Sequence, residues 1–339
     1  MSTPSTTEPV RGTQATGDEQ KWFNSPVTFS EGSLSEIRKH VPSFERRRFG
    51  LIQPDERWSS LNKRLDTIVR RPFGEDQAYV PVGVVSSEYS LLPHTAVLDV
   101  AGKVLAANNI PQSAVKVQLR LSEYGERMNL SVFLPEKYQF DPGDGYPMAL
   151  RLEFVNSVEG STRFRVLMGW FRFICSNGLV IGVTRFEMRR RHVGELALSD
   201  VGRILTSGLA QSSIEKQNFK KWRKIPICPS RLNLWVDKKL QKLWGFKASA
   251  RAFYIARFGS DAEIHGQYKD QSPTTILMLP TKPVPGAPSN CENLFDLSQT
   301  LAWLAKERRD VQEQLEWREQ IPGLLSAYMR MSVSQTNRK

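Results

Sequence analysis

The spacing of hydrophobic residues changes twice along the chain. From about residue 114 apolar and polar residues alternate, a period of two that is typical of strands with one face in water. Turn signals at Gly125, 141–145 and Glu159-Gly160 divide this stretch. Asn177-Gly178 is the strongest hairpin signal, because both residues tolerate the positive φ of a tight turn. The sequence therefore predicts an antiparallel β-meander over residues 111–192.

Upstream of the meander the pattern is mixed. Residues 1–24, rich in Ser, Thr, Gly and acidic residues, are predicted to form a disordered N-terminal tail. Residues 25–110 are predicted to supply N-terminal helices and a strand that pack on the core. Their elements are short helices at 33–39 and 57–69, an extended segment at 78–90 and a helix that Pro93 opens and 108–111 ends.

Beyond Ser199 the hydrophobic period returns to about 3.6 residues, the helical value. Helices are predicted at 200–223, 233–244 and 248–257, followed by a proline-rich loop at 280–288 and one or two helices over 294–331. Residues 193–332 thus form a basic helical region that makes one compact unit with the meander. The predicted fold class is α+β, an antiparallel meander core followed by a basic helical region.

Positive charge gathers in one segment. The chain has 47 Lys and Arg against 35 Asp and Glu, a formal net charge of +12. Between Arg185 and Arg257 it holds 17 basic and 5 acidic residues, so this segment carries the entire excess. Folding does not require a field of one sign, and we therefore expect a polyanionic partner. Nucleic acid is the commonest such partner, with a membrane surface or an acidic protein as alternatives.

Helical spacing places aromatic residues among these cations. One stripe holds Trp235, Lys238, Lys239 and Lys242, with Val236, Leu240 and Leu243 on the expected core face. A second stripe, on the preceding helix, holds Lys216, Phe219, Lys220 and Arg223. Cations neutralise phosphates, and a base stacks on an aromatic ring for roughly 1–3 kcal/mol. The predicted nucleic-acid-binding residues are Arg185, Arg189, Arg190, Arg191, Lys216, Phe219, Lys220, Lys221, Trp222, Arg223, Lys224, Trp235, Lys238, Lys239 and Lys242.

The sequence gives little support for a metal, a cofactor or a membrane span. Cys175, Cys228 and Cys291 are too widely spaced for a disulfide framework or a paired zinc site, so reduced thiols in the cytoplasm are expected. The four histidines are scattered, and no run of about 18 apolar residues occurs. No cofactor, metal site or catalytic constellation is predicted, and the expected location is cytoplasmic.

Three short motifs resemble a known family. They are Asn156-Ser157-Val158-Glu159-Gly160-Ser161, Arg172-Phe173-Ile174-Cys175-Ser176-Asn177-Gly178 and Arg191-His192. The set resembles a "domain of unknown function" family encoded by phages and plasmids, over about residues 84–294. The family has His-Asp where this chain has Val158-Glu159, which weakens any metal or acid–base role at that position. The resemblance implies a mobile-element context and no settled activity.

The leading hypothesis is a non-catalytic, oligomeric phage or plasmid protein that binds single-stranded DNA in recombination, by strand annealing, or in replication. A meander followed by a long basic helix is similar in architecture to phage single-strand annealing proteins, which is an analogy only.

Other interpretations stay open. Each charged stripe taken alone is equally typical of a solvated surface, and the run at 46–48, offset by nearby acidic residues, is more typical of a solvated turn than of a second contact. An interaction protein that inhibits a host defence factor through its basic face would be favoured by a lack of exposed aromatic residues. A metal-dependent nuclease would use carboxylates of the meander: Glu153, Glu159 and Glu187, or Asp141 and Asp144.

Overall fold

The computed structural model describes residues 20–52, 58–172, 177–179, 186–187, 198–267 and 269–331. Residues 1–19 of the predicted tail lie outside these ranges. The tail prediction is wrong at its C-terminal end, because residues 21 and 22 form a strand and Trp22 is completely buried. Within the described residues, no helix has the apolar length that a bilayer crossing needs.

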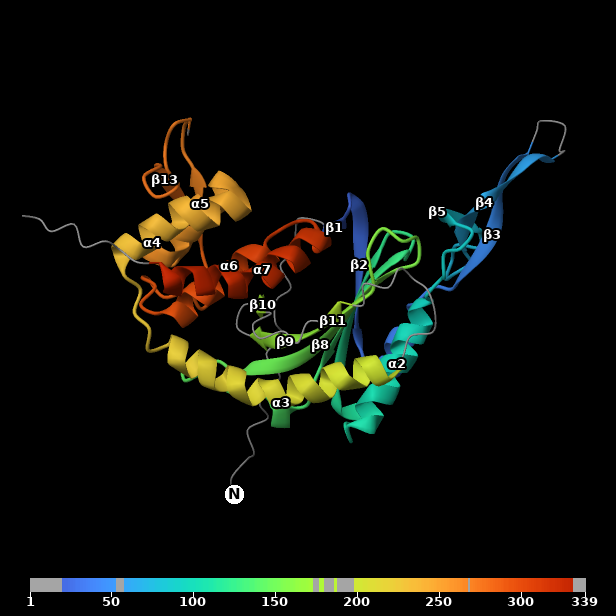
Figure 1. Cartoon of the computed structure of the whole chain (residues 1–339), viewed down its shortest axis with the longest axis horizontal. Coiled ribbons are helices and arrows are strands. Elements are labelled where there is room, and N and C mark those ends of the chain that lie inside the picture. The colour runs from blue at the N-terminus through green and yellow to red at the C-terminus, as the bar shows by residue number, and fades with distance from the viewer. Residues whose placement is uncertain are drawn as a thin grey trace, which may run out of the picture.

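The described residues form an antiparallel sheet of eight strands. Figure 1 shows this sheet at the centre of the molecule. The strand order is β1-β2-β6-β7-β8-β9-β10, and β11 also pairs with β9. These strands are β1 (Lys21–Trp22), β2 (Ser25–Gly32), β6 (Lys116–Ser122), β7 (Arg127–Phe133), β8 (Met148–Ser157), β9 (Arg165–Arg172), β10 (Asn177–Leu179) and β11 (Phe186–Glu187). The meander is confirmed, and with it the α+β class.

Helices cover both faces of this sheet (Figure 1). The apolar face packs on α2 (His94–Ala107) and α3 (Leu198–Trp222) through residues such as Leu152 and Met168. The opposite face packs on α7 (Val311–Arg330), which follows α6 (Leu294–Lys306). The predicted water-exposed face is therefore wrong: every residue of β8 is buried.

A second sheet forms an arm that projects away from the body (Figure 1). Its strands are β3 (Phe44–Ile52), β4 (Trp58–Arg70) and β5 (Val80–Ser86), with β4 in the middle. The helix predicted over 57–69 is wrong, because this segment is β4. This segment pairs with β3 on one side, where Phe44 lies opposite Arg70, and with β5 on the other, where Val80 lies opposite Arg70. Pairing on both sides outweighs an apolar spacing that also fits a helix. The short helix α1 (Leu34–Arg38) is confirmed, capped by Ser33.

The helical lobe, residues 229–331, completes the molecule. It contains α4 (Pro229–Trp235), a π-helical segment (Val236–Leu240), α5 (Gln241–Phe258) and a hairpin of β12 (Ser260–Ile264) and β13 (Met278–Pro283), before α6 and α7. The predicted helices are confirmed, although the one expected at 233–244 begins at Pro229 and includes a π-helical segment. The gap predicted between 244 and 248 contains Gly245, whose non-helical backbone interrupts α5. The hairpin was not predicted, and two prolines assigned to a loop lie in β13, an edge strand where the missing N–H costs little.

The Asn177-Gly178 hairpin turn is also wrong. Both residues lie in β10, paired with Arg172 and Phe171 of β9. The connection therefore spans residues 173–176, which are outside the described ranges. The described residues also contain 3₁₀ turns at Gln112–Ala114 and Glu136–Tyr138.

Candidate nucleic-acid interface

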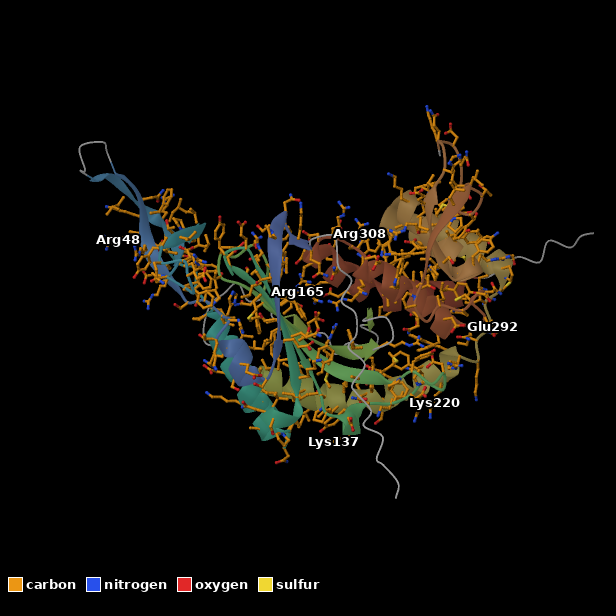
Figure 2. The ribbon with its side chains drawn as sticks, turned by 180° about the vertical axis from the view of Figure 1, so that it is seen from behind. Arg48, Lys137, Arg165, Lys220, Glu292 and Arg308 are labelled. Carbon is orange, nitrogen blue, oxygen red and sulfur yellow. The ribbon has the colours of Figure 1, made fainter. Side chains whose placement is uncertain are left out.

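Eleven of the predicted contact residues lie in the described chain, either in the last turns of α3 and directly after it or between the end of α4 and the start of α5. Arg185, Arg189, Arg190 and Arg191 lie outside the described residues. Six lysines are exposed, and we call them the α3 lysines (Lys220, Lys221, Lys224) and the α5 lysines (Lys238, Lys239, Lys242). Figure 2 shows Lys220 at the end of α3 that borders the helical lobe, far from Arg48 on the arm.

These lysines form two separate groups on the sequence, each clear of acidic partners. None of the six makes an ion pair within the described part of the chain. Lys220 and Lys221 also lie in the last turn of α3, where the helix dipole favours a cation. Their charge therefore stabilises the helix end and remains available to an anion in solution.

The predicted stacking role of Phe219 is wrong, because its side chain is completely buried. Its ring lies 5.7 Å from the ring of Phe140, 5.7 Å from that of Trp222 and 5.9 Å from that of Phe295. This aromatic cluster joins α3 to the sheet and to α6. Trp222 is half-buried at its edge.

Trp235 is likewise buried, so the second predicted stacking role is wrong. Its Nε1 donates to the carbonyl oxygen of Leu324 at 3.0 Å, and its ring meets that of Tyr328 edge-on. The π-helical segment Val236–Leu240 explains the error. A π turn holds one more residue than an α turn, so Lys238 and Lys239 within it and Lys242 after it lie away from the face that Trp235 occupies. For the same reason Leu243, predicted in the core, is 50% exposed.

Lys216 and Arg223 are half-buried and already have partners. The Nζ of Lys216 lies 5.5 Å from the ring centre of Trp170 and 5.6 Å from that of Phe140, a cation–π arrangement. An Nη of Arg223 lies 3.5 Å from a carboxylate oxygen of Asp144. Of the predicted stripe on α3, only Lys220 is exposed and without a partner among the described residues.

The first of the family-like motifs forms a hydrogen-bonded hub at the end of β8. Asn156 donates through Nδ2 to the carbonyl oxygen of Leu92 at 3.0 Å and lies 2.9 Å from Nδ1 of His94. Burial lowers the pKa of His94 to about 4, so the ring is neutral. The neutral ring accepts at Nδ1 and donates from Nε2 to the carbonyl oxygen of Gly125 at 2.9 Å. The motif therefore fixes the start of α2 to the sheet.

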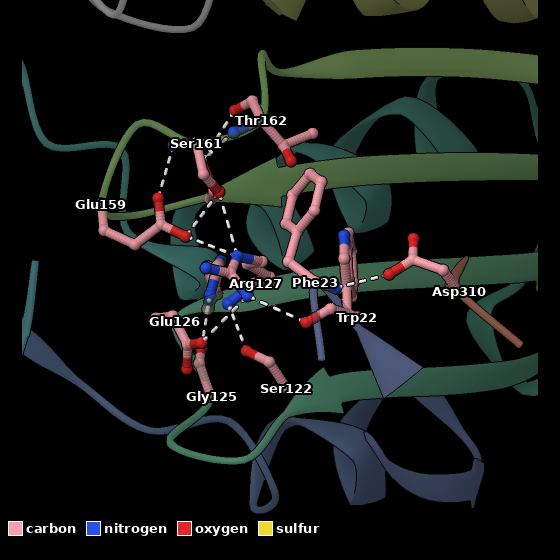
Figure 3. A network of polar contacts seen from close by, with 12 residues as sticks. Trp22, Phe23, Ser122, Gly125, Glu126, Arg127, Glu159, Ser161, Thr162 and Asp310 are labelled. Carbon is pink, nitrogen blue, oxygen red and sulfur yellow. Dashed lines mark hydrogen bonds and ion pairs between the residues drawn. The ribbon is translucent and has the colours of Figure 1, made fainter. Parts of the chain in front are cut away.

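Figure 3 shows how the second half of this motif reaches the N-terminal strand. Arg127 donates through Nε to Glu159 at 2.6 Å and through an Nη to the carbonyl oxygen of Trp22 at 3.1 Å. Glu159 also accepts from the hydroxyl of Ser161 at 2.5 Å. The backbone N–H of Phe23 donates to Asp310, which caps α7, at 2.6 Å. Glu159 is held by Arg127 and joins elements that are distant in sequence.

The sequence matches one described protein family. A model of the family described as a domain of unknown function (DUF932) matches residues 81–276, more than half of the chain. The chain belongs to the DUF932 family. No curated protein and no solved structure matches it.

The DUF932 match begins in β5 and includes α2, the meander and α3. It ends at residue 276, between β12 and β13, earlier than the predicted limit near 294. Both lysine groups and the Asn156 hub lie inside it. The arm strands β3 and β4 and the helices α6 and α7 lie outside it.

Carboxylates proposed for a nuclease have other partners in this DUF932 protein. Glu153 accepts hydrogen bonds from Arg151 and Arg318, and Asp144 from Arg172. Asp141 accepts three backbone N–H bonds within its own loop, which hold its pKa below the usual range. The side chain of Glu187 lies outside the described part. Over the described ranges, no group of three His, Cys, Asp or Glu side chains gathers to hold a metal.

Proposed function

We propose that this DUF932 protein binds single-stranded DNA, without catalysis, in the recombination or replication of a phage or plasmid. The observation that carries the proposal is the set of six exposed lysines described above. They belong to the one segment that holds the whole net charge of +12. A cation without an internal ion pair can bind a phosphate without first breaking a contact within the protein.

Tyr146 takes the stacking role that Phe219 cannot fill. It is 44% exposed, and the guanidinium of Arg172 lies 5.3 Å from its ring centre. Arg172 donates to Asp144 at 2.6 Å, and Asp144 in turn pairs with Arg223, in the loop that follows α3. Tyr146 thus stands beside the end of α3 that carries the α3 lysines, where a base on its ring would have phosphate-binding groups nearby.

The test is fluorescence anisotropy of a labelled thymidine oligonucleotide and of a duplex of equal length, at low salt. The proposal expects tighter binding of the single strand, because stacking on Tyr146 needs an unpaired base. Mg²⁺ should leave the oligonucleotide intact. If neither DNA binds at low salt, the proposal fails; if Mg²⁺ produces strand cleavage, the protein is a nuclease instead.

Substitution of Tyr146 isolates the stacking contact. Tyr146→Ala is expected to weaken single-strand binding by roughly 1–3 kcal/mol and duplex binding much less. Tyr124→Ala is the matched control, since Tyr124 is a 41% exposed aromatic residue in the turn between β6 and β7. Equal losses in the two variants would contradict the assignment.

One observation favours a second function. With Phe219 and Trp235 buried, the basic stripes themselves expose no aromatic ring, which suits an acidic protein partner such as a host defence factor. That interaction would be the better account if low-salt anisotropy detects no nucleic-acid binding. Assembly into a homo-oligomer is part of the main proposal, and the mass of the particle with and without single-stranded DNA, by light scattering, tests it.

A further inference from the structure

A row of polar residues crosses the face of the central sheet that lies under α7. Glu153 of β8 is 1% exposed, and the strand register puts Ser131 of β7 directly opposite it. Such opposite residues have Cβ atoms about 4.5–5.5 Å apart and point to the same side. The row is independent of the lysine surface and of the proposed DNA binding.

Glu153 holds this row together. Its Oε2 accepts from Arg151 at 2.9 Å, and its Oε1 accepts from Arg318 of α7 at 2.9 Å and from Asn129 at 2.9 Å. The Oδ1 of Asn129 accepts from Arg120 of β6 at 3.4 Å. Two guanidinium groups thus bind the carboxylate of Glu153 directly, and a third, that of Arg120, is connected to it through Asn129.

The charges of this group do not balance. Burial alone would raise the pKa of Glu153, but Arg151 and Arg318 outweigh it and hold the pKa at about 2. Burial lowers the pKa of Arg151 to about 10, which still leaves it charged at neutral pH. The adjacent Arg165–Glu319 pair, at 3.1 Å, is neutral by itself. Among the described residues, three guanidinium groups thus share the single carboxylate of Glu153, and this excess of two positive charges strongly destabilises an interior.

Two polar atoms of the row also lack a partner. The Nε of Arg120 and the hydroxyl of Ser131 are buried without a hydrogen bond. Ser131 itself is 1% exposed. Buried donors are satisfied in the great majority of native proteins, so an orphan pair beside excess positive charge points to a missing acceptor.

We propose that Arg120, Ser131, Arg151 and Arg318 bind a small dianionic phosphate group, either inorganic phosphate or the phosphate of a mononucleotide. The two negative charges of the ligand match the excess of two positive charges in the group. The planar fork of arginine suits the oxygen atoms of a phosphate, and the Ser131 hydroxyl adds one further donor. Glu153 orients two of the arginines and does not touch the ligand.

Thermal unfolding in sodium phosphate against sodium chloride of equal ionic strength tests this site. The unfolding midpoint should rise steadily with the logarithm of phosphate concentration, because the ligand binds only the folded state. A parallel series with a nucleoside 5′-monophosphate identifies the preferred form. A midpoint that depends on ionic strength alone, with both ligands, overturns the proposal.

Two variants separate ligand binding from a structural role. Arg120→Gln should weaken phosphate binding about tenfold or more, while the midpoint without phosphate stays equal or rises because an unbalanced charge is gone. Ser131→Ala should also reduce the phosphate response without lowering that midpoint. Ser249→Ala is the matched control, since Ser249 is completely buried in α5 with an unpartnered hydroxyl. Unchanged phosphate responses in both Arg120→Gln and Ser131→Ala would refute the site.

The site is also distinct from the DNA-binding surface. Phosphate at constant ionic strength should therefore leave the anisotropy of a bound oligonucleotide unchanged. Displacement of the oligonucleotide by phosphate at millimolar concentration would show one shared site and overturn the proposal of a small-ligand pocket.

Discussion

At the scale of single residues, Glu215 is a buried carboxyl group in an aromatic environment. It is 4% exposed, and its Oε2 accepts a hydrogen bond from Nε1 of Trp170 at 2.8 Å, whereas Oε1 has no partner. Burial raises the pKa of Glu215 to about 8. The group is therefore largely protonated at neutral pH, and it links α3 to β9 as a neutral acid.

Protonation of Glu215 makes the free energy of unfolding depend on pH between 4.5 and about 8. The folded protein holds the proton more tightly than the unfolded chain does, so Glu215 stabilises the fold at pH 4.5 and below, and this contribution is lost as the pH rises to about 8. Glu215→Gln keeps an acceptor for Trp170 and removes the titration. Urea unfolding at pH 5.5 and 8 should show that the wild type loses more stability than the variant. Equal losses would contradict the raised pKa.

The buried aromatic residues show where residue-level prediction ends. Periodicity identified the buried core positions Val236 and Leu240 and the exposed α5 lysines correctly. It missed that Trp235 is buried, because a π turn is set by tertiary packing and leaves no spacing signal. It also missed the buried charge network, whose members Arg120 of β6 and Arg318 of α7 are far apart in the sequence.

At the scale of elements, strong local signals were predicted well and long-range pairing was not. The α2 and α3 helices and the meander follow from their own periodicity. The β4 strand was predicted as a helix because Trp58, Leu61, Leu65 and Ile68 have helical spacing. This spacing gives no sign of the pairing with β3 and β5 that makes the segment a strand. Asn177-Gly178 has the composition of a turn, but pairing with β9 keeps it in a strand.

Substitution of Gly245 and Gly202 by alanine tests whether the break in α5 requires a glycine. Gly245 has φ 79° and ψ 173°, a conformation nearly restricted to glycine, where it interrupts α5. Gly245→Ala is expected to lower the free energy of unfolding by about 1–3 kcal/mol, although no other atom lies within 4 Å of the added methyl group. Gly202→Ala, with equal space but within α3, should instead raise it by roughly 0.5–1 kcal/mol. Chemical denaturation measures both, and a stabilising Gly245→Ala would contradict the strained break.

At the scale of the whole molecule, a central sheet separates two kinds of charge. The face covered by α7 holds the buried arginine network around Glu153. The opposite face is covered by α3, whose C-terminal end carries the exposed α3 lysines. The charge count of the sequence was enough to find the second kind, because surface cations appear directly as an excess. The buried arginine network cannot be found in this way, because it depends on strand register and burial, which only the folded sheet defines.

The salt dependence of oligonucleotide binding tests the central claim most directly. For Lys220→Glu/Lys221→Glu/Lys224→Glu, the loss of three phosphate contacts should weaken binding and flatten the slope of log K against log salt by about 2, at roughly 0.7 per contact. The control Lys39→Glu/Lys63→Glu/Lys103→Glu makes the same change in net charge at exposed lysines elsewhere. Its slope should stay close to that of the wild type. Equal slopes for the two triple variants would contradict a DNA-binding surface at the α3 lysines.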